Sequence, residues 1–381
     1  MKVVVAMDSF KGSMTSMEAG NAVKEGILRA VPQAEVVVKP LADGGEGTID
    51  ALMEGLGGKR IVLSVTGPMG KRTECSYGIL EDGKTAVMEM AQAAGITLVA
   101  EAERNPLYAT TYGVGEMIRD AVHRGCRHFI MGIGGSATND GGVGMLTALG
   151  FCFLDEKGQT IKGGADILSR ITAVNANGVL PELKECEFCI ACDVNNPLCG
   201  ENGASFIYGP QKGLPLELCS KVDEDMRHYA EIAEAFSGKN CRETAGAGAA
   251  GGLGFAFLTF LNARLMPGAE LILNTVCLEE ELKTAQYVVT GEGRLDDQTM
   301  MGKAPTKVAK LAKQYGCKVL AFAGSVTRDA VKCNDAGIDA FFPVIRDIVS
   351  REKAMEPETA RQNIADTAEQ VFRLVRETEG R

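Results

Sequence analysis

Residues 3–27, VVVAMDSFKGSMTSMEAGNAVKEGI, carry the pattern that decides the fold. Val3–Met7 is a short apolar run rich in β-branched residues, which is typical of a buried β-strand. Thr15 and Glu18 have the spacing of a capping box, so a helix is predicted to begin beside them. The apolar face of that helix is formed by Ala19, Ala22, Val23 and Ile27. A strand that leads directly into an amphipathic helix is typical of the first half of a βαβ unit.

The alternation of strand and helix returns near the other end of the chain. Further strands are predicted at Glu35–Leu41, Tyr287–Thr290, Lys318–Ala323 and Ala340–Val344. Helices are predicted to follow Pro305 and Pro357, because proline is favoured in the first turn of a helix. This alternation favours a parallel sheet that is covered by helices on both faces.

The middle of the chain has a different pattern. Short strands joined by Gly-Pro and Asp-Gly turns run from Ile61 to Met90, and Phe151–Ile161 repeats the pattern, which indicates antiparallel pairing. We therefore predict a discontinuous Rossmann-like α/β domain formed by residues 1–62 and 286–381. Residues 63–285 are predicted to form an inserted second α/β domain with antiparallel strands.

Composition narrows the classes of function. The 381 residues are 45% hydrophobic and 24% charged, with a formal net charge of −10 and a pI near 5.1. Nucleic acid or an anionic membrane surface as partner would require a basic surface, which this charge argues against. The apolar run at the start is too short for a signal peptide, and no segment is long enough to span a membrane. We expect a cytoplasmic protein, monomeric or homodimeric, that acts on small molecules.

The twelve cysteines include one cluster with metal-like spacing, Cys186, Cys189 and Cys192. Within a strand, residues three positions apart lie on opposite faces, so these thiols are poorly arranged to share one metal. The sequence FCIACDV is typical of a buried strand. We interpret the cluster as structural rather than as a zinc or iron–sulfur site.

Several predicted strands end in a mixture of glycine, carboxylates and cations. Such endings are seen at Asp8-Ser9-Phe10-Lys11-Gly12, at Asp43-Gly44-Gly45-Glu46, at residues 134–140, at Asp193 and at residues 290–294. Because ligands of open α/β sheets bind beyond the carboxyl ends of the strands, these endings are candidate site segments. Backbone N–H groups and cations suit phosphates, and carboxylates suit Mg²⁺ and a base, so the pattern favours phosphoryl transfer.

A second enzymatic interpretation rests on a glycine pattern. Gly132-x-Gly134-x-x-Ala137 follows a predicted strand, and Asp155 lies 23 residues after Gly132, as in a Rossmann dehydrogenase that binds NAD. The residues Asn139-Asp140-Gly141-Gly142 argue against the helix that this motif requires. A two-lobed solute-binding protein is disfavoured by the missing signal peptide and the many cysteines.

Six segments together resemble the signature segments of class I glycerate kinases. They are MDSFKGS, LADGGEGT, GIGGSATNDGG, ACDVNNPLCG, GAGAAGGLG and TGEGRLDDQT with the following GK-x-P. The resemblance spans residues 1 to about 345. It implies ATP, Mg²⁺ and D-glycerate, with 2-phosphoglycerate as product and 3-phosphoglycerate as the alternative. It also implies an active cleft between two domains.

Roles for individual residues follow from chemistry alone. Asp193 is the predicted general base, because a carboxylate at the end of a buried strand is costly unless it has a function. Two cations are predicted as catalytic and substrate-binding residues: Lys11 pairs with a phosphate or the glycerate carboxylate, and Arg294 with the carboxylate. Lys303 is assigned to a phosphate beside a helix N-terminus. Asp8 and Ser9 are substrate-binding candidates. The predicted phosphate loop is Gly134, Gly135, Ser136 and Thr138. The metal candidates are Asp43, Glu46, Asp140, Glu292 and Asp296.

Overall fold

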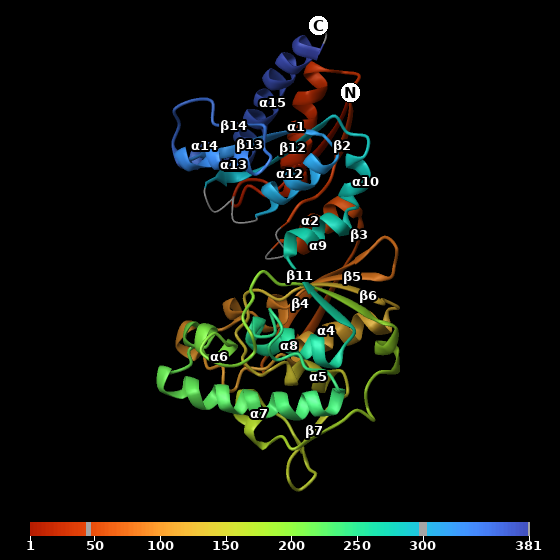
Figure 1. Ribbon diagram of the computed structural model, residues 1–381, viewed down its shortest axis with the longest axis vertical. Helices are drawn as coiled ribbons and strands as arrows, with labels where there is room; N and C mark the ends of the chain where they lie inside the picture. The colour runs from red at the N-terminus through yellow and green to blue at the C-terminus, as the bar shows by residue number, and fades with distance from the viewer. Residues whose placement is uncertain (43–46, 297–302, 380–381) are drawn as a thin grey trace. The chain divides into compact units, whose positions relative to one another are not determined.

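The computed structural model describes residues 1–42, 47–296 and 303–379 (Figure 1). The chain forms two compact units. Unit 1 consists of Met1–Asp43, Asp50–Gly57 and Ala269–Arg381, and unit 2 consists of Gly44–Ile49 and Gly58–Gly268. The strand β3, Gly58–Thr66, lies wholly in unit 2, whereas the predicted boundary at 62/63 would fall inside it. The predicted cleft between domains stays a prediction.

Unit 1 is built around a five-stranded parallel sheet. Its strands are β1 (Lys2–Met7), β2 (Glu35–Val38), β12 (Tyr287–Leu295), β13 (Lys318–Val326) and β14 (Ala340–Pro343), in the order β14-β13-β12-β1-β2. The central pair joins distant parts of the chain, because Val3 lies opposite Tyr287 in parallel register. β12 extends past the predicted end at Thr290 because β13 continues beside it, with Arg294 opposite Ser325.

Helices lie on both faces of this sheet. They are α1 (Ser16–Ala30), α2 (Thr48–Leu56, of which Asp50 onward belongs to unit 1), α9 (Gly268–Thr275), α10 (Leu278–Leu282), α12 (Ala304–Gln314), α13 (Lys332–Asp335), α14 (Arg351–Met355) and α15 (Pro357–Glu379). The predicted capping box of α1 is confirmed: Thr15 Oγ1 accepts from Glu18 N, and Glu18 Oε2 accepts from Thr15 N. Val3, Val5 and Met7 pack with Val23 and Ile27 in a single core.

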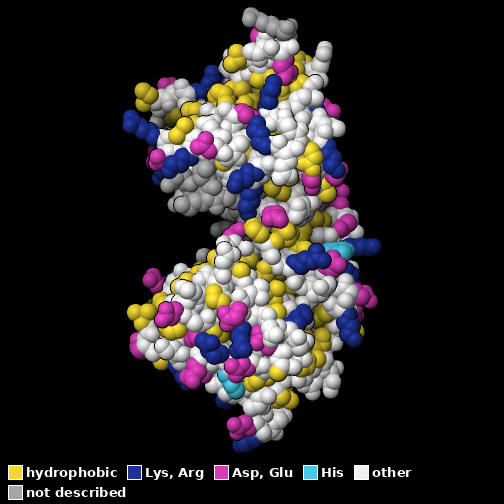
Figure 2. All heavy atoms as spheres, viewed as in Figure 1, with side chains coloured by type: hydrophobic (Ala, Val, Ile, Leu, Met, Phe, Trp, Pro, Cys, Tyr) yellow, Lys and Arg dark blue, Asp and Glu magenta, His cyan; other side chains and the backbone are white. Residues whose placement is uncertain are grey.

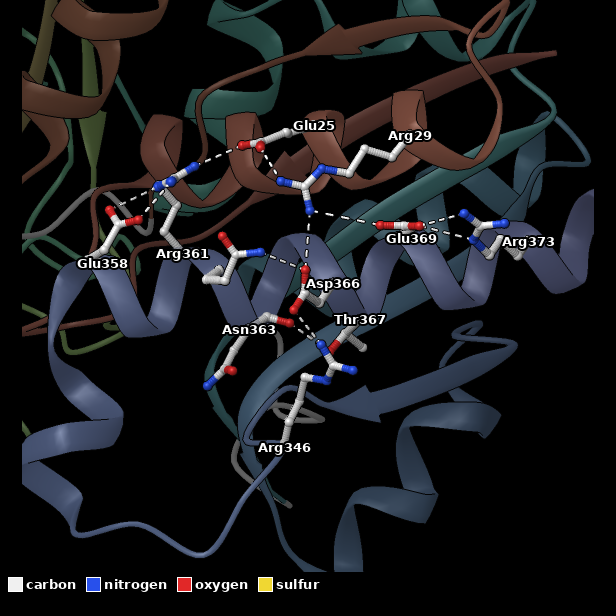
Figure 3. Close-up of polar contacts among 11 residues, drawn as sticks. Glu25, Arg29, Arg346, Glu358, Arg361, Asn363, Asp366, Thr367, Glu369 and Arg373 are labelled. Carbon is white, nitrogen blue, oxygen red and sulfur yellow. Dashed lines mark hydrogen bonds and ion pairs between the residues drawn. The ribbon is translucent and has the colours of Figure 1, made fainter.

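α1 and α15 lie side by side and are joined by a network of ion pairs (Figures 1 and 3). Arg361 Nη1 lies 2.8 Å from Glu25 Oε2, and Arg29 Nη1 lies 3.2 Å from Asp366 Oδ1. Because these groups are partly exposed, each pair contributes only about 0.2–1 kcal/mol. The apolar contact between the helices is therefore the main attraction, and the charges favour one register.

Unit 2 contains a six-stranded mixed sheet in the order β11-β10-β6-β5-β4-β3. Its strands are β3, β4 (Arg72–Leu80), β5 (Thr85–Glu89), β6 (His128–Gly132), β10 (Glu187–Ala191) and β11 (Ala263–Met266). β3, β4 and β5 pair antiparallel, whereas β5, β6, β10 and β11 are parallel. A small antiparallel sheet holds β7 (Cys152–Leu154), β8 (Thr160–Ile161) and β9 (Ala173–Asn175).

The helices of unit 2 enclose its larger core. They are α3 (Ala91–Ala94), α4 (Tyr112–His123), α5 (Val143–Ala148), α6 (Ala204–Tyr208), α7 (Cys219–Ser237) and α8 (Ala249–Phe260). Short 3₁₀ helices include Ala165–Arg170 and Pro210–Lys212. The core includes stacked Phe129 and Phe188 rings, 4.6 Å between centroids. The predicted fold class, a parallel α/β domain with a second α/β domain that contains antiparallel strands, is confirmed.

Charges are intermixed over the surface shown in Figure 2, where Lys and Arg alternate with Asp and Glu on both units. Among the described residues, none of the helices combines the length and the apolar character that crossing a membrane requires.

The contact between α1 and α15 generates a test of the fold. A Cβ added to Gly26 would lie 2.0 Å from Ala365 O and 2.8 Å from Ala368 Cβ. We expect Gly26→Ala to destabilise the protein by about 2 kcal/mol, because overpacking against backbone outweighs the better helix propensity of alanine. Urea unfolding measures the change. Asn21→Ala, on the exposed side of α1, is the matched control and should be neutral or slightly stabilising. Equal stability of both variants would contradict the tight contact.

Candidate functional site

The sheet of unit 1 reverses its direction of growth between β1 and β12. From β1 the chain passes through α1 to β2 on one side, and from β12 it passes through α12 to β13 on the other side. Such a reversal leaves the loops after both strands diverging, and ligands of open α/β sheets bind at this point. The carboxyl ends of β1 and β12 therefore mark the candidate site of unit 1.

The loop after β1 carries three of the predicted residues. Asp8 N donates to Gly291 O over 2.8 Å, which fixes this loop beside β12, and Asp8 Oδ1 accepts from Ser9 N over 2.7 Å. The chain then turns back on itself through the bridge between Phe10 and Met14. Lys11 is exposed within this turn, and no ion pair to it is found among the described residues. Its ammonium group is therefore accessible to an anionic ligand.

The end of β12 and the start of α12 bring four predicted residues together. Lys303 Nζ lies 3.5 Å from Glu292 Oε2 and 3.9 Å from Asp296 Oδ1. Arg294 Nε lies 3.4 Å from Asp296 Oδ2, and the Arg294 side chain is 63% exposed. Lys303 is the N-cap residue of α12, and Pro305 lies in the first turn of that helix. The four side chains form one network of alternating charge that could bind both anions and a cation.

Two carboxylates of this network, Glu292 and Asp296, are among the predicted candidates for Mg²⁺. Mg²⁺ prefers carboxylate oxygens and commonly takes only one or two from the protein. Glu292 and Asp296 both lie within 4 Å of Lys303 Nζ, at 3.5 Å and 3.9 Å, so two carboxylates are present at this point. No group of three or more His, Cys, Asp or Glu placed to hold a metal is found within residues 1–42, 47–296 and 303–379. The candidates Asp43 and Glu46 lie outside the described residues.

In unit 2 the loop after β6 holds the predicted phosphate-binding residues. Gly134 and Gly135 are exposed, and no backbone partner of their N–H groups is found among the described residues. The next residues are anchored to the segment after α3, since Ala137 N donates to Ala94 O and Ile96 N donates to Gly135 O. A Cβ on Gly134 would meet no described atom within 4 Å, so the fold itself does not require glycine there. Close approach of a ligand is a physical reason for it.

The loop after Gly135 is crossed by the glycine-rich start of α8. Gly251 has φ +67° and a Cβ on it would lie 2.1 Å from Thr138 O. Gly251 O accepts from Gly141 N over 2.9 Å. Two glycine-rich segments, more than a hundred residues apart in the chain, therefore pack backbone against backbone. Gly252 serves the same crossing, because a Cβ on it would lie 2.8 Å from Gly141 Cα.

Asp140 is buried at this crossing and surrounded by donors. Its carboxylate accepts from Thr111 N and Thr111 Oγ1 over 2.8 Å each, and from Gly142 N and Gly144 N over 3.2 Å each. Burial nevertheless raises the pKa of Asp140 above its ordinary value. With four donors and no exposure, this carboxylate is suited to fixing the loop rather than to holding Mg²⁺. Thr138 is also fully buried, so its hydroxyl does not face solvent.

Lys212 lies against the predicted phosphate loop, and no sequence pattern indicated it. Its Nζ donates to Ser136 Oγ and to Thr138 O, 2.7 Å each, and the residue is only 3% exposed. Burial lowers the pKa of Lys212 to about 7, while the negative charge of Asp140 acts in the opposite direction. Lys212 ends the short 3₁₀ helix Pro210–Lys212, 76 residues from Ser136, where periodicity gives no information.

Glu89 is a second residue that the sequence did not indicate. It ends β5, beside the end of β6, and is 6% exposed. Its Oε1 accepts from Ile49 N over 3.2 Å, near the start of α2. A carboxylate at a helix N-terminus is stabilised by the helix dipole.

Asp193 does not have the buried environment on which its selection as a base depended. The strand β10 ends at Ala191, and Asp193 is exposed beyond it. Asp193 Oδ1 accepts from Gly268 N over 3.1 Å, at the first residue of α9. The expected burial was wrong because the strand ends two residues earlier than the apolar pattern suggested. A role as base therefore stays a prediction without the support of burial.

The Rossmann interpretation lacks its required helix. α5 begins at Val143, six residues after Ala137, so the helix that this motif requires does not start at the Gly132–Ala137 turn. Asp155 Oδ1 accepts from Lys157 N and Gln159 N and thereby closes a local turn.

In the cysteine cluster, Cys186 Sγ lies 3.3 Å from Glu182 O and Cys192 Sγ lies 3.4 Å from Val194 O. These thiols contact backbone carbonyls at opposite ends of β10.

Comparison with known proteins gives a consistent result. Residues 3–376 match the model of the glycerate kinase family. A glycerate kinase of Halalkalibacterium halodurans is 45% identical over 368 residues, 95% of this chain and 97% of the relative. A glycerate 2-kinase of Escherichia coli is 43% identical over 354 residues, 93% of each chain. A crystal structure assigned to glycerate kinase 2 of Salmonella typhimurium LT2 superimposes with a TM-score of 0.91 at 40% identity and covers 100% of both chains.

The buried Lys212 generates a test by pH. Its pKa is about 7 in the folded protein, against 10.5 ordinarily, so between these values only the unfolded chain holds the proton. Stability should rise with pH across this window, and below pH 7 the cost of burying the charge is fully present. Lys212→Met removes this dependence. We expect the difference in unfolding free energy, wild type minus variant, to increase by up to about 1.4 kcal/mol per pH unit above pH 7.

Urea unfolding at pH 6, 7.5 and 9 measures this difference. The charged group that acts on Lys212 is Asp140 in the facing loop, and the backbone of Arg104 packs against the neighbouring Gly213. Lys221→Met, at an exposed lysine of α7, is the matched control and should run parallel to wild type. Parallel curves for Lys212→Met as well would show that Lys212 keeps an ordinary pKa.

Proposed function

The chain belongs to the glycerate kinase family, and from this premise we propose that it transfers the γ-phosphoryl group of ATP to D-glycerate. A bond forms between a glycerate hydroxyl oxygen and the γ-phosphorus, and the bond from that phosphorus to the β-γ bridging oxygen breaks. The hydroxyl proton is released, and the products are ADP and 2-phosphoglycerate. The alternative acceptor hydroxyl would give 3-phosphoglycerate.

The observation that carries the proposal is the exposed Gly134–Gly135 turn at the carboxyl end of β6. Its N–H groups have no backbone partner among the described residues, and no side chain covers Gly134. Backbone N–H groups arranged in this way bind phosphoryl oxygens. We propose that this turn binds the nucleotide phosphates and that Ser136 lies at its edge. Thr138, which is fully buried, would act only by fixing the loop.

Unit 1 supplies groups that suit an organic acid and a phosphate. The exposed Arg294 guanidinium can bind a carboxylate through two parallel hydrogen bonds. Lys11, Asp8 and Ser9 line the loop after the neighbouring strand, where Lys11 adds positive charge and Ser9 a hydroxyl. Lys303 lies at the N-terminus of α12, where its charge and the helix dipole both favour a phosphate.

We also propose that Glu292 and Asp296 bind a cation. Mg²⁺ held by these carboxylates would neutralise negative charge on a phosphoryl group.

The reaction itself tests the proposed function. We expect protein incubated with ATP, D-glycerate and MgCl₂ to form ADP and 2-phosphoglycerate in equal amounts, as measured by phosphorus NMR. Excess EDTA should abolish the reaction, and omission of glycerate should leave ATP intact. A resonance of 3-phosphoglycerate alone would correct the acceptor hydroxyl. No product under these conditions would contradict the proposed function.

Asp193 is the proposed general base, and one substitution distinguishes this role from a purely structural one. Asp193→Asn preserves an oxygen that can accept from Gly268 N, so stability should change little. The variant loses the proton acceptor, and kcat should fall about 10²–10⁴-fold with KM values nearly unchanged.

Steady-state kinetics and thermal melting measure both effects. Asp155→Asn is the matched control, because Asp155 also accepts from backbone N–H groups in a turn of unit 2. A kcat within a factor of about two of wild type, in a folded variant, would remove Asp193 from the mechanism.

A further inference from the structure

Lys212 occupies a position that a lysine rarely holds in a folded protein. It is 3% exposed, and its nitrogen contacts a hydroxyl and a carbonyl of the loop after Gly135. A buried amine is costly unless its hydrogen bonds are satisfied. Two N–H groups are satisfied here, and the described residues provide no acceptor for a third. An isolated structural role is a poor explanation for so costly a group, because an apolar side chain could fill the same space.

The contact with Ser136 determines what the serine hydroxyl can do. A hydroxyl accepts through its lone pairs and donates its single proton. Lys212 Nζ donates to Ser136 Oγ over 2.7 Å, which occupies a lone pair and leaves the serine proton to be donated elsewhere. The described residues provide no acceptor for that proton, and Ser136 keeps 7% exposure next to the exposed Gly135.

The second contact fixes the other side of the same loop. Lys212 Nζ donates to Thr138 O, the carbonyl against which Gly251 packs at the crossing of the two backbones. Lys212 Nζ therefore binds both neighbours of Ala137, which are Ser136 and Thr138. Movement of Ser136 relative to Thr138 would break one of these bonds.

We propose that Lys212 is a positioning residue that holds the Ser136 hydroxyl as a hydrogen-bond donor to a phosphoryl oxygen of the nucleotide at the Gly134–Gly135 turn. The inference rests on the proposed function, which assigns phosphates to that turn. It adds a residue that acts on the nucleotide through another side chain, not by contact.

A double-mutant cycle on ATP affinity tests the inference. Lys212→Met keeps the length of the side chain without its donors, and Ser136→Ala removes the hydroxyl. We expect each variant to weaken ATP binding about tenfold by isothermal titration calorimetry, the size of one lost hydrogen bond to a charged group. The double variant should bind no more weakly than Lys212→Met, because both act through one hydroxyl. The KM for glycerate should stay unchanged in these variants. A general destabilisation of the fold would change it as well.

The pH dependence provides a second readout. Burial places the pKa of Lys212 near 7. The protonated amine can only donate to Ser136 Oγ, whereas the neutral amine can also accept the serine proton and so withdraw that donor from the phosphoryl oxygen. ATP affinity of wild type, relative to Lys212→Met at each pH, should therefore fall as pH rises through neutrality. Lys221→Met is the control for removing a lysine from unit 2, and its affinity profile should match wild type.

The outcomes separate this inference from the proposed function. If wild type binds ATP and the effects of the two substitutions add, the inference is overturned and the proposed function is not. The same holds if neither substitution affects ATP binding. Wild type that fails to bind ATP overturns both. If Lys212→Met does not fold, Ser136→Ala and Ser136→Thr decide: the inference requires the alanine to weaken ATP binding and the threonine, which retains a hydroxyl, to bind within about threefold of wild type. Equal affinity of wild type and Ser136→Ala overturns it.

Discussion

The arrangement of unit 2 depends on a place where two backbones cross with no room for side chains. At Gly251 a Cβ would collide with the carbonyl of Thr138, and Gly141 N donates to Gly251 O at the same crossing. This contact determines where the loop after β6 can run. Once the loop is fixed, Asp140 is buried among backbone donors and the Thr138 carbonyl reaches Lys212. Gly134 and Gly135 are then left exposed at the end of the strand.

Much of this structure follows from local patterns in the sequence. The capping box at Thr15 and the alternating strands and helices depend on neighbouring residues, so they could be predicted. The same holds for Gly134 and Gly135, which follow an apolar strand. Lys212 could not be predicted, because its burial is produced by a loop 76 residues away in the chain. The expected burial of Asp193 was wrong for a related reason: hydrophobicity located β10 but not the residue at which its pairing ends. Asp43 and Glu46 lie outside the described residues.

The two candidate sites differ in how far their charged side chains are exposed to water. At the end of β12, Lys303, Glu292 and Asp296 are partly exposed and balance one another, so water and ligands can exchange for either partner at small cost. Behind the Gly134–Gly135 turn, Asp140 and Lys212 are buried, and burial raises the pKa of Asp140 and lowers the pKa of Lys212. The first arrangement suits recognition of a charged ligand. The second suits a rigid loop, and donors fixed before the proposed phosphate ligand binds would reduce the reorganisation that the reaction requires.

The pairing of β1 with β12 affects the order in which a ribosome-bound chain can fold. Val3 finds its partner Tyr287 only after about 280 further residues have been made, which at about 5–20 residues per second takes on the order of tens of seconds. During that time all segments of unit 2 become available for folding, while Val3–Met7, a β-prone apolar segment, waits without its β12 neighbour. Such segments aggregate when left exposed, so chaperones that bind nascent chains have an evident target in β1.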